Sequence, residues 1–240
     1  MLITNSRNFS HSHSHSHSHI HSHAVILLAS GLSRRLGQPK QLLNKNNESL
    51  ICYMTRLAML TQPSLIVIVV PQNQSAILDS IADLTDQLNS PHSLIKIVTN
   101  SSPEKGLGES LSIGIQALAT FDGLSVNSVL IMGIDQVLLD SEHLSKLLAG
   151  KHTVVASSYS PLDDHHSKIA NEADIIGLPI VIDYERLKNW QSALIGDKGL
   201  RHLIRALPSN QISTVDNPKL SHDIDTPAQL TYAKQKHWID

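Results

Sequence analysis

The chain has 240 residues, of which 41% are hydrophobic and only 3% aromatic, so it can bury a sizeable core of aliphatic side chains. Its formal net charge of −2 argues against a nucleic-acid-binding protein, because such proteins usually have a basic surplus. The single cysteine, Cys52, excludes a disulfide framework and a cysteine zinc cluster within the chain, and suits a reducing compartment. The apolar runs are too short to span a membrane, and the first residues lack the apolar segment of a secretory signal. We therefore expect a cytoplasmic protein with no membrane contact.

Residues 1–23 differ in composition from the rest of the chain. From His11 to His23 a histidine stands at every second position, and the residues between them are serine except for Ile20. Such a low-complexity stretch cannot bury a core, so we expect residues 1–23 to be a disordered tail and residues 24–240 to form one domain. Two interpretations of the tail stay open. It is either a mobile or purification-type extension, or an arm that captures divalent metals through its imidazoles.

The remainder alternates short apolar runs with segments whose apolar residues recur at helical spacing. We expect strands at 24–29, 65–70, 94–98, 126–132, 154–156, 175–182 and 212–215, of which the sixth is broken by a glycine and a proline. Between the strands we expect helices at 75–88, 109–119 and 200–207, and three more that begin at caps: from Ser49 to 60, from Ser141 to 148 and from Asp183 to 190. A final helix has Pro227 in its first turn. This alternation predicts βαβ units and a Rossmann-like, three-layer α/β/α fold with a mainly parallel sheet.

The first strand opens into a small, polar and basic loop. The sequence LASGLS at 28–33 is followed by Arg34 and Arg35 and, after four more residues, by Lys40. Proteins of the α/β class place phosphate-bearing ligands beside such a loop, at the carboxyl end of a central strand. Its small residues let backbone N–H groups approach an anion, and its basic residues supply positive charge. The loop has neither the Walker A pattern nor the glycine pattern of dinucleotide-binding folds.

The pattern G-x-S-x-R-x-G-x-x-K-x-L that begins at Gly31 resembles the opening motif of the MobA-like nucleotidyltransferase superfamily, with Arg35 and Lys40 at its fixed positions. Five later stretches resemble further elements of that superfamily in the same order, so that the resemblance covers about residues 24–236. They are Asn100…Gly106…Ser110-Leu111…Gly114, Asp135-Gln136, Gly177-Leu178-Pro179, Gly196-Asp197-Lys198-Gly199-Leu200-Arg201 and Asp223-Ile224-Asp225-Thr226-Pro227.

The resemblance implies a fold of the nucleotide-diphospho-sugar transferase type and a division of roles among these residues. The nucleotide would be bound by Leu28, Ala29, Ser30, Gly31, Ser33, Gly106 and Ser110. Arg35 and Lys40 would contact its phosphates as the catalytic pair. Asp135 and Asp225, each expected at the end of a strand on the same edge of the sheet, would bind Mg²⁺ (or Mn²⁺). Basic charge and Mg²⁺ suit this chemistry, because the transition state of nucleotidyl transfer is anionic and Mg²⁺ takes one or two carboxylates plus substrate phosphates.

Other interpretations of single residues stay open. Asp135 and Asp225 are also suited to capping a helix or forming a turn. Cys52 lies in a predicted amphipathic helix, which favours a buried structural thiol over a nucleophile. The run from Asp163 to His166 could bind metal but is more typical of a solvated loop. Val137 replaces the usual proline, and the aromatic residue common before Gly106 is absent.

Ser30 bears on the choice of nucleotide. Members that use GTP typically have L-A-G-G after the first strand, whereas those resembling molybdenum cofactor cytidylyltransferase have L-A-A-G, often with P-K-Q-L-L. This chain has LASG at 28–31 and PKQLL at 39–43, which sides with the cytidylyl type. We therefore expect CMP transfer from CTP to the terminal phosphate of the molybdenum cofactor with release of pyrophosphate. A recipient molybdoenzyme is a candidate partner.

Two alternatives to this function stay open. The first is transfer by the same fold with another nucleotide or acceptor, such as GTP, a sugar phosphate or a polyol phosphate. The second comes from a different class: a metal-binding accessory protein that works through the His tail.

Overall fold

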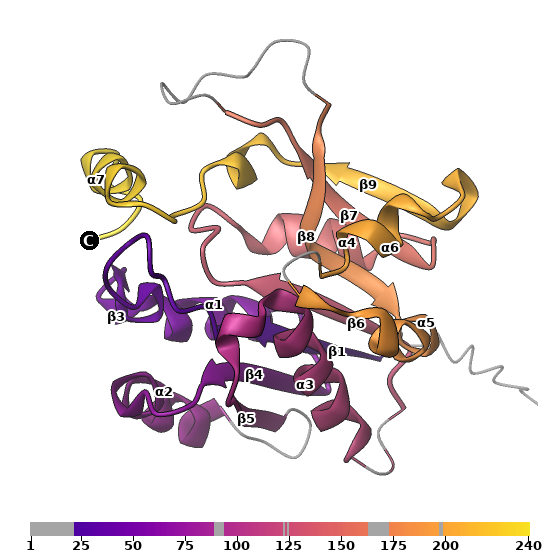
Figure 1. The fold of residues 1–240 in the computed structure, drawn as a ribbon, viewed down its shortest axis with the longest axis horizontal. Coiled ribbons are helices and arrows are strands. Elements are labelled where there is room, and N and C mark those ends of the chain that lie inside the picture. The colour runs from indigo at the N-terminus through magenta and orange to yellow at the C-terminus, as the bar shows by residue number, and fades with distance from the viewer. Residues whose placement is uncertain (1–21, 89–93, 122, 124, 163–172, 197–198) are drawn as a thin grey trace, which may run out of the picture.

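A computed structural model describes residues 22–88, 94–121, 123, 125–162, 173–196 and 199–240. Its centre is a seven-stranded sheet in the order β5-β4-β1-β6-β8-β7-β9 (Figure 1). The strands are β1 (His23–Leu28), β4 (Leu65–Pro71), β5 (Leu94–Asn100), β6 (Ser128–Gly133), β7 (Val154–Tyr159), β8 (Ile175–Asp183) and β9 (Ile212–Asp216). Only β8 runs against its neighbours, so the predicted mainly parallel sheet is confirmed.

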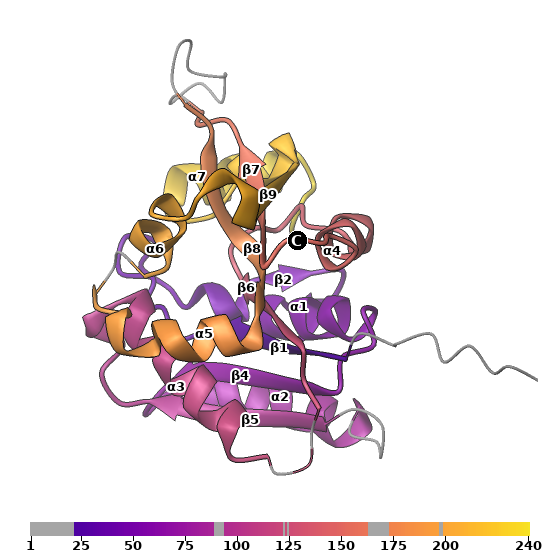
Figure 2. The same cartoon turned by 90° about the vertical axis from the view of Figure 1, so that its right-hand side faces the viewer.

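Helices cover both faces of this sheet. On one face lie α1 (Leu50–Met59), α2 (Ser75–Leu88), α4 (Ser141–Leu148) and α7 (Pro227–Gln235). On the other face lie α3 (Leu107–Ala119), α5 (Tyr184–Trp190) and α6 (Arg201–Arg205), as the edge-on view shows (Figure 2). A short hairpin of β2 (Asn44–Lys45) and β3 (Glu48–Ser49) precedes α1. The three-layer α/β/α class is therefore confirmed.

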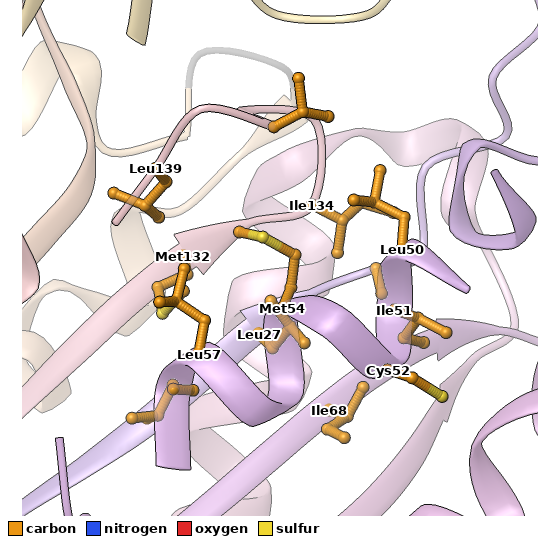
Figure 3. Packing of buried hydrophobic residues seen from close by; sticks show 14 of the residues in the cluster. Leu27, Leu50, Ile51, Cys52, Met54, Leu57, Ile68, Met132, Ile134 and Leu139 are labelled. Atoms are coloured by element: carbon orange, nitrogen blue, oxygen red, sulfur yellow. The ribbon is translucent and has the colours of Figure 1, made fainter. Parts of the chain in front are cut away.

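Strand β1 is buried along its whole length, which explains its unbroken apolar sequence. Its side chains alternate between the two faces: Val25 and Leu27 belong to the core under α1 and α2, and Ala24 and Ile26 to the core under α3. Figure 3 shows the first of these cores, where Leu50, Ile51, Met54 and Leu57 of α1 lie over Leu27, Ile68 and Met132 of three adjacent strands. This packing fixes β1, and with it the loop that follows.

Ser22 and His23, which the sequence assigned to the tail, are part of the folded domain. His23 is the first residue of β1 and is 6% exposed, and the Ser22 side chain lies 2.7 Å from that of Ser64. His23 Nε2 lies 2.9 Å from Thr61 Oγ1. The sequence did not reveal that the strand begins at His23, because the alternation of histidine and serine continues up to that residue. Residues 1–21 lie outside the described part of the chain.

Three local expectations change in detail. Asp140, one residue before the expected Ser141, caps α4, because its Oδ1 accepts a hydrogen bond from His143 N at 2.9 Å. Ser49 is the residue before α1 but makes no capping bond; its hydroxyl accepts instead from Ser80 Oγ. β8 continues through Gly177 and Pro179. The register of its pairing with β7 shifts there, so Pro179, which has no backbone N–H, is not paired with a residue of β7.

Within the described residues, the helices lack the combination of length and apolar character that crossing a membrane requires.

Candidate functional site

The loop after β1 is held by side chains that follow it in the sequence. Gln41 Nε2 donates to the carbonyl oxygens of Ala29 at 2.7 Å and Gly31 at 2.9 Å. Ser33, with φ of 50°, places its Oγ 3.2 Å from the backbone nitrogen of Lys40, which donates to it. The loop therefore folds back on itself and returns Lys40 to the carboxyl end of the sheet.

Lys40 is the centre of a charged cluster there. Its Nζ lies 2.5 Å from Asp225 Oδ1 and 3.2 Å from Asp135 Oδ2, and Arg35 Nη2 lies 2.7 Å from the other oxygen of Asp225. The two cations differ in burial: the Lys40 side chain is 9% exposed and that of Arg35 is 72% exposed. The predicted catalytic pair and the predicted metal-binding acids thus come together in one cluster.

Lys40 and Asp225 hold each other in their charged forms. Burial by itself would lower the pKa of Lys40, but the carboxylates of Asp135 and Asp225 outweigh it and the pKa is raised. Burial would likewise raise the pKa of Asp225, but the hydrogen bond and charge of Lys40, with the charge of Arg35, lower it instead. The result is an ion pair between Lys40 and Asp225 at the end of the sheet, with a carboxylate oxygen of Asp135 beside the same ammonium group.

The two acids reach this point from different elements. Asp135 follows the end of β6, as expected. Asp225 does not follow a strand, contrary to our expectation; it comes after a 3-10 turn (Pro218–Ser221) and immediately before Thr226, the N-cap of α7. A capping box explains its place, since Gln229 Oε1 accepts from the backbone nitrogens of Asp225 at 3.0 Å and Thr226 at 2.9 Å. A backbone bond from Ile224 N to Asp135 O at 3.2 Å ties the two segments together.

Two cavities adjoin the cluster on the side of the glycine loop. One, of about 300 Å³, is lined by a set of residues that contains most of the predicted nucleotide contacts: Leu28, Ser30, Gly31, Gly106 and Ser110, with Lys40 and Asp135. The second, of about 280 Å³, is lined by Ser33, Arg34, Arg35, Lys40 and Asp225, among others. Ala29 is the exception: its side chain lies in the hydrophobic core, and only its backbone supports the loop.

Ser30 and Ser110 are joined at the wall of the first cavity. Their hydroxyl oxygens are 2.5 Å apart, and Asn100 Nδ2 donates to Ser110 Oγ at 3.1 Å. Asn100 is completely buried, and its Oδ1 accepts from the backbone nitrogen of Ser102. Asn100 belongs to the same motif as Gly106 and Ser110 but was absent from the expected site. Its position at the carboxyl end of β5, directly before the loop that contains Gly106, was the signal that could have included it.

A third cavity, of about 240 Å³, lies on the other side of Asp135. It is lined by polar groups that include Gln136, Tyr159, Arg201 and Asp223. Burial, together with the negative charges of Asp135 and Asp225, raises the pKa of Asp223 to about 6, and burial raises the pKa of Tyr159 to about 12. Gln136, Arg201 and Asp223 belong to stretches that resemble the superfamily, but none of them was assigned to the site. Nothing local to Tyr159 indicated a site.

The sequence of residues 25–212 matches the model of the MobA-like NTP transferase domain. The chain belongs to this family. It is a nucleotidyltransferase of the MobA-like type, as the resemblance predicted. The match ends before Asp225, so the acid beside α7 is placed by the structure alone.

Solved structures show the same fold at low sequence identity. An rv0371c homolog from Mycobacterium sp. strain JC1 is 21% identical with a TM-score of 0.65, over 90% of this chain and 96% of that one. Rv0371c of Mycobacterium tuberculosis, solved with manganese, is 17% identical with a TM-score of 0.59, over 88% and 97%. The inositol-1-phosphate CTP transferase of T. maritima is 15% identical with a TM-score of 0.60, over 91% and 95%. No curated protein matches the chain.

Three further expectations concern residues away from the charged cluster of this MobA-like domain. Cys52 is buried, and its Sγ donates to Ser80 O at 3.0 Å, so it is a structural thiol as expected. The run from Asp163 to His166 and the pair Asp197-Lys198 lie outside the described residues. In the part of the chain that the structure describes, no three His, Cys, Asp or Glu side chains are grouped to hold a metal ion.

Proposed function

We propose that this MobA-like nucleotidyltransferase moves CMP from CTP to the terminal phosphate of the molybdenum cofactor and releases pyrophosphate. The observation that supports it most directly is the cluster in which Lys40 joins Asp135 and Asp225 between two groups of cavities. In the reaction an oxygen of the acceptor phosphate forms a bond to the α-phosphorus of CTP. The bond from that phosphorus to the oxygen bridging the α- and β-phosphates breaks, and pyrophosphate leaves with the electron pair.

The glycine-loop side of the cluster suits the triphosphate. The loop cavity has Arg34, Arg35 and Lys40 in its wall, which gives it positive charge where the phosphates would lie. Lys40 is fixed by two carboxylates and needs little reorganisation, whereas the exposed Arg35 is free to follow the ligand. We assign phosphate binding and charge neutralisation during transfer to Lys40 and Arg35.

A divalent cation fits the two carboxylates. Asp135 and Asp225 are both within hydrogen-bonding distance of one ammonium group, so their oxygens already converge, and no third carboxylate completes a protein-only site among the described residues. Two carboxylates completed by phosphate oxygens is the usual environment of Mg²⁺. We assign metal binding to Asp135 and Asp225; the cation, Mg²⁺ or Mn²⁺, would neutralise phosphate charge. A structural neighbour, Rv0371c, was solved with manganese.

The nucleotide cavity favours a small base. Leu28, Ser30, Gly31, Gly106 and Ser110 bound about 300 Å³, and the bonded pair of Ser30 and Ser110 fixes one wall. A glycine in place of Ser30, as in the GTP-using pattern, would remove that side chain and widen the cavity. This supports CTP, and the transferase of T. maritima that shares the fold is also named for CTP.

A turnover assay tests the proposal. The full chain is incubated with Mg²⁺, the molybdenum cofactor and equal concentrations of CTP, GTP or ATP, and both pyrophosphate and the dinucleotide product are measured. We expect product with CTP at a kcat/KM at least tenfold above the other nucleotides. Equal use of the three nucleotides would contradict the CTP assignment, and transfer only to inositol 1-phosphate or another polyol phosphate would contradict the acceptor.

A second arm of the assay uses a variant that lacks residues 1–21, a deletion that leaves Ser22 and His23 in the fold. We expect it to keep full activity. Loss of transfer would instead favour the alternative in which the His tail is the working part of the protein.

A further inference from the structure

Two neighbouring residues of β8, Leu178 and Pro179, leave the sheet ladder. On the β6 side the pairing of β8 stops at Ile180. On the β7 side it passes from Ile180 directly to Gly177 while β7 advances by a single residue, so the two residues between them form a bulge. Their carbonyl oxygens need partners from outside the ladder, because buried backbone polar groups are almost always hydrogen-bonded.

Side chains from other segments supply those partners. Gln136 Nε2 donates to the carbonyl oxygen of Leu178 at 2.9 Å, and Ser157 Oγ donates to that of Pro179 at 2.7 Å. His143 Nε2 in turn lies 2.8 Å from Ser157 Oγ. The three polar side chains are at most 5% exposed, so water competes little for these bonds. The bulge is therefore held by a buried network.

The hydrogen bonds of this network have a fixed direction. A carbonyl oxygen can only accept, so the single hydroxyl proton of Ser157 goes to Pro179. Ser157 Oγ then accepts from His143, whose Nε2 must carry a proton. Burial lowers the pKa of His143, so the ring is a neutral donor at pH 7. His143 therefore orients the Ser157 hydroxyl toward the bulge.

The bulge carries a side chain that borders both halves of the site. Leu178 and Asp135 both line the nucleotide cavity of about 300 Å³ and also the cavity of about 240 Å³ on the other side of the cluster. A Cβ on Gly133 would lie 2.9 Å from Asp135 Oδ1 and 3.9 Å from Leu178 Cδ1, so both side chains border the same glycine. Ser157 and His143 are in the lining of neither cavity and can act on them only through the bulge.

The network and the side chain that it controls belong to opposite faces of the sheet. His143 is on α4, which packs on the same face as α1 and α2. Leu178 packs with the core on the other face, under α3, α5 and α6 (Figure 2). The network can thus set the position of Leu178 without contacting a substrate.

We propose that Ser157, oriented by His143, is a positioning residue that holds Leu178 as a partition between CTP and the acceptor. The inference rests on the proposed function, since a partition matters only to a transfer between two substrates. When the partition shifts, water competes with the acceptor. The water oxygen bonds to the α-phosphorus of CTP, the bond to the bridging oxygen breaks, and pyrophosphate leaves with the electron pair. Water gives up a proton to solvent, and the product is CMP.

Product analysis tests the partition with the full chain, CTP, Mg²⁺ and the molybdenum cofactor. Ser157→Ala leaves the Pro179 carbonyl without its donor. We expect the kcat for dinucleotide formation to fall about tenfold and the ratio of CMP to dinucleotide to rise about fivefold, because misplacing reacting groups by about 1 Å can cost about 10²-fold in rate. The ratio does not depend on the folded fraction of the enzyme, so a merely structural role would leave it unchanged.

Two variants of His143 separate orientation of the hydroxyl from packing. His143→Leu removes the donor to Ser157 and should raise the ratio of CMP to dinucleotide about twofold. His143→Gln supplies a neutral N–H in place of Nε2 and should restore the parental ratio. The matched control is Thr55→Ala, because Thr55 is also fully buried and its hydroxyl donates to Ile51 O at 2.8 Å within α1. It should lose stability and keep the parental ratio.

Leu178→Ala acts on the partition directly and keeps the test decisive if Ser157→Ala does not fold. It removes a side chain that lines both cavities, so the ratio should rise at least as much as in Ser157→Ala. An unchanged ratio in Leu178→Ala would overturn the inference. So would equal ratios in Ser157→Ala and Thr55→Ala, or in the two His143 variants.

The failure of this inference is distinct from that of the proposed function. If the molybdenum cofactor accepts CMP and the ratio is parental in all of these variants, the partition is wrong and the function stands. If the molybdenum cofactor is not used, the ratio is measured with whichever acceptor the turnover assay identifies. A higher ratio in Ser157→Ala and Leu178→Ala would then support the partition while the acceptor assignment fails.

Discussion

The two halves of the sheet differ in how their part of the site is built. In the nucleotide half, β5, β4, β1 and β6 are parallel neighbours, and one continuous loop after β1 supplies the cations and several of the small residues, which Gly106 and Ser110 complete. In the acceptor half, β8 runs antiparallel, its pairing with β7 is irregular, and the site is lined by residues from β7, β8, α6 and the segment before α7. A site whose cations come from one loop is visible in a local pattern, whereas a site assembled from many separate segments is not.

The charged cluster is the place where the two halves meet. Lys40 belongs to the loop of the nucleotide half, and Asp225 to the segment that closes the acceptor half. Gln41 and Gln229 hold these two segments from either side, each through bonds to the backbone. The cluster therefore fixes the halves relative to each other and holds the groups that the reaction needs.

The largest effect should follow the loss of the cation at this meeting point. Lys40→Met keeps the length of the side chain but leaves Asp135 and Asp225 without their shared partner and the triphosphate without its buried cation. We expect kcat/KM for nucleotidyl transfer to fall by about 10²–10³-fold. The matched control is Lys146→Met on α4, where the lysine is exposed and pairs only with Glu142. A similar loss of activity in Lys146→Met would show that the effect is not specific to Lys40.

A smaller effect, on stability, should come from adding a methyl group to a glycine in each half, because the two glycines are packed differently. In the nucleotide half a Cβ on Gly114 would lie 2.7 Å from Ile26 Cγ2, because α3 approaches β1 closely. The better helix propensity of alanine offsets part of the cost of overpacking, so Gly114→Ala should lower the free energy of unfolding by about 1–2 kcal/mol in urea denaturation. In the acceptor half a Cβ on Gly177 meets nothing closer than 3.5 Å, and Gly177→Ala should change stability by less than about 0.5 kcal/mol. Equal losses of stability in Gly114→Ala and Gly177→Ala would contradict this difference in packing between the two halves.

The smallest effect concerns the start of β1, at the end of the nucleotide half that is remote from the site. Burial lowers the pKa of His23 to about 4 from a usual 6.5. The Thr61 hydroxyl donates to Ala58 O and accepts from the ring, so the neutral histidine is the form that fits. Between pH 6.5 and 4 the unfolded chain binds a proton that the folded chain does not, so stability is lost as the pH falls.

The size of this effect follows from the two pKa values. Between pH 7.5 and pH 6 the protein should lose about 1 kcal/mol of stability that a His23→Gln variant does not lose. Urea denaturation of both proteins at the two pH values measures the difference, and subtracting the variant removes the contribution of the other histidines. Identical pH dependence of the two proteins would show that His23 is not titrating in this window.

The elements that were predicted well are those decided by local chemistry. Uninterrupted apolar runs gave the buried parallel strands, and apolar residues at helical spacing gave the seven helices with ends that shifted by only a few residues. Asp183 was expected as a helix cap and is one, since its Oδ1 accepts from Arg186 N. The loop from Gly31 to Lys40 could be placed after β1 for the same reason, because a strand and the loop that follows it are contiguous in the chain.

What the sequence by itself determined is the layer architecture, the family and the presence of a basic, glycine-containing loop at the end of a central strand. These depend on residues close together in the chain, where spacing translates directly into geometry. Only the tertiary structure decided that one lysine joins Asp225 to Asp135, and that Tyr159 and Arg201 line a cavity beside Asp135. Those relations are made by long-range packing and by buried hydrogen bonds between distant segments, and no spacing along the chain encodes which segments meet.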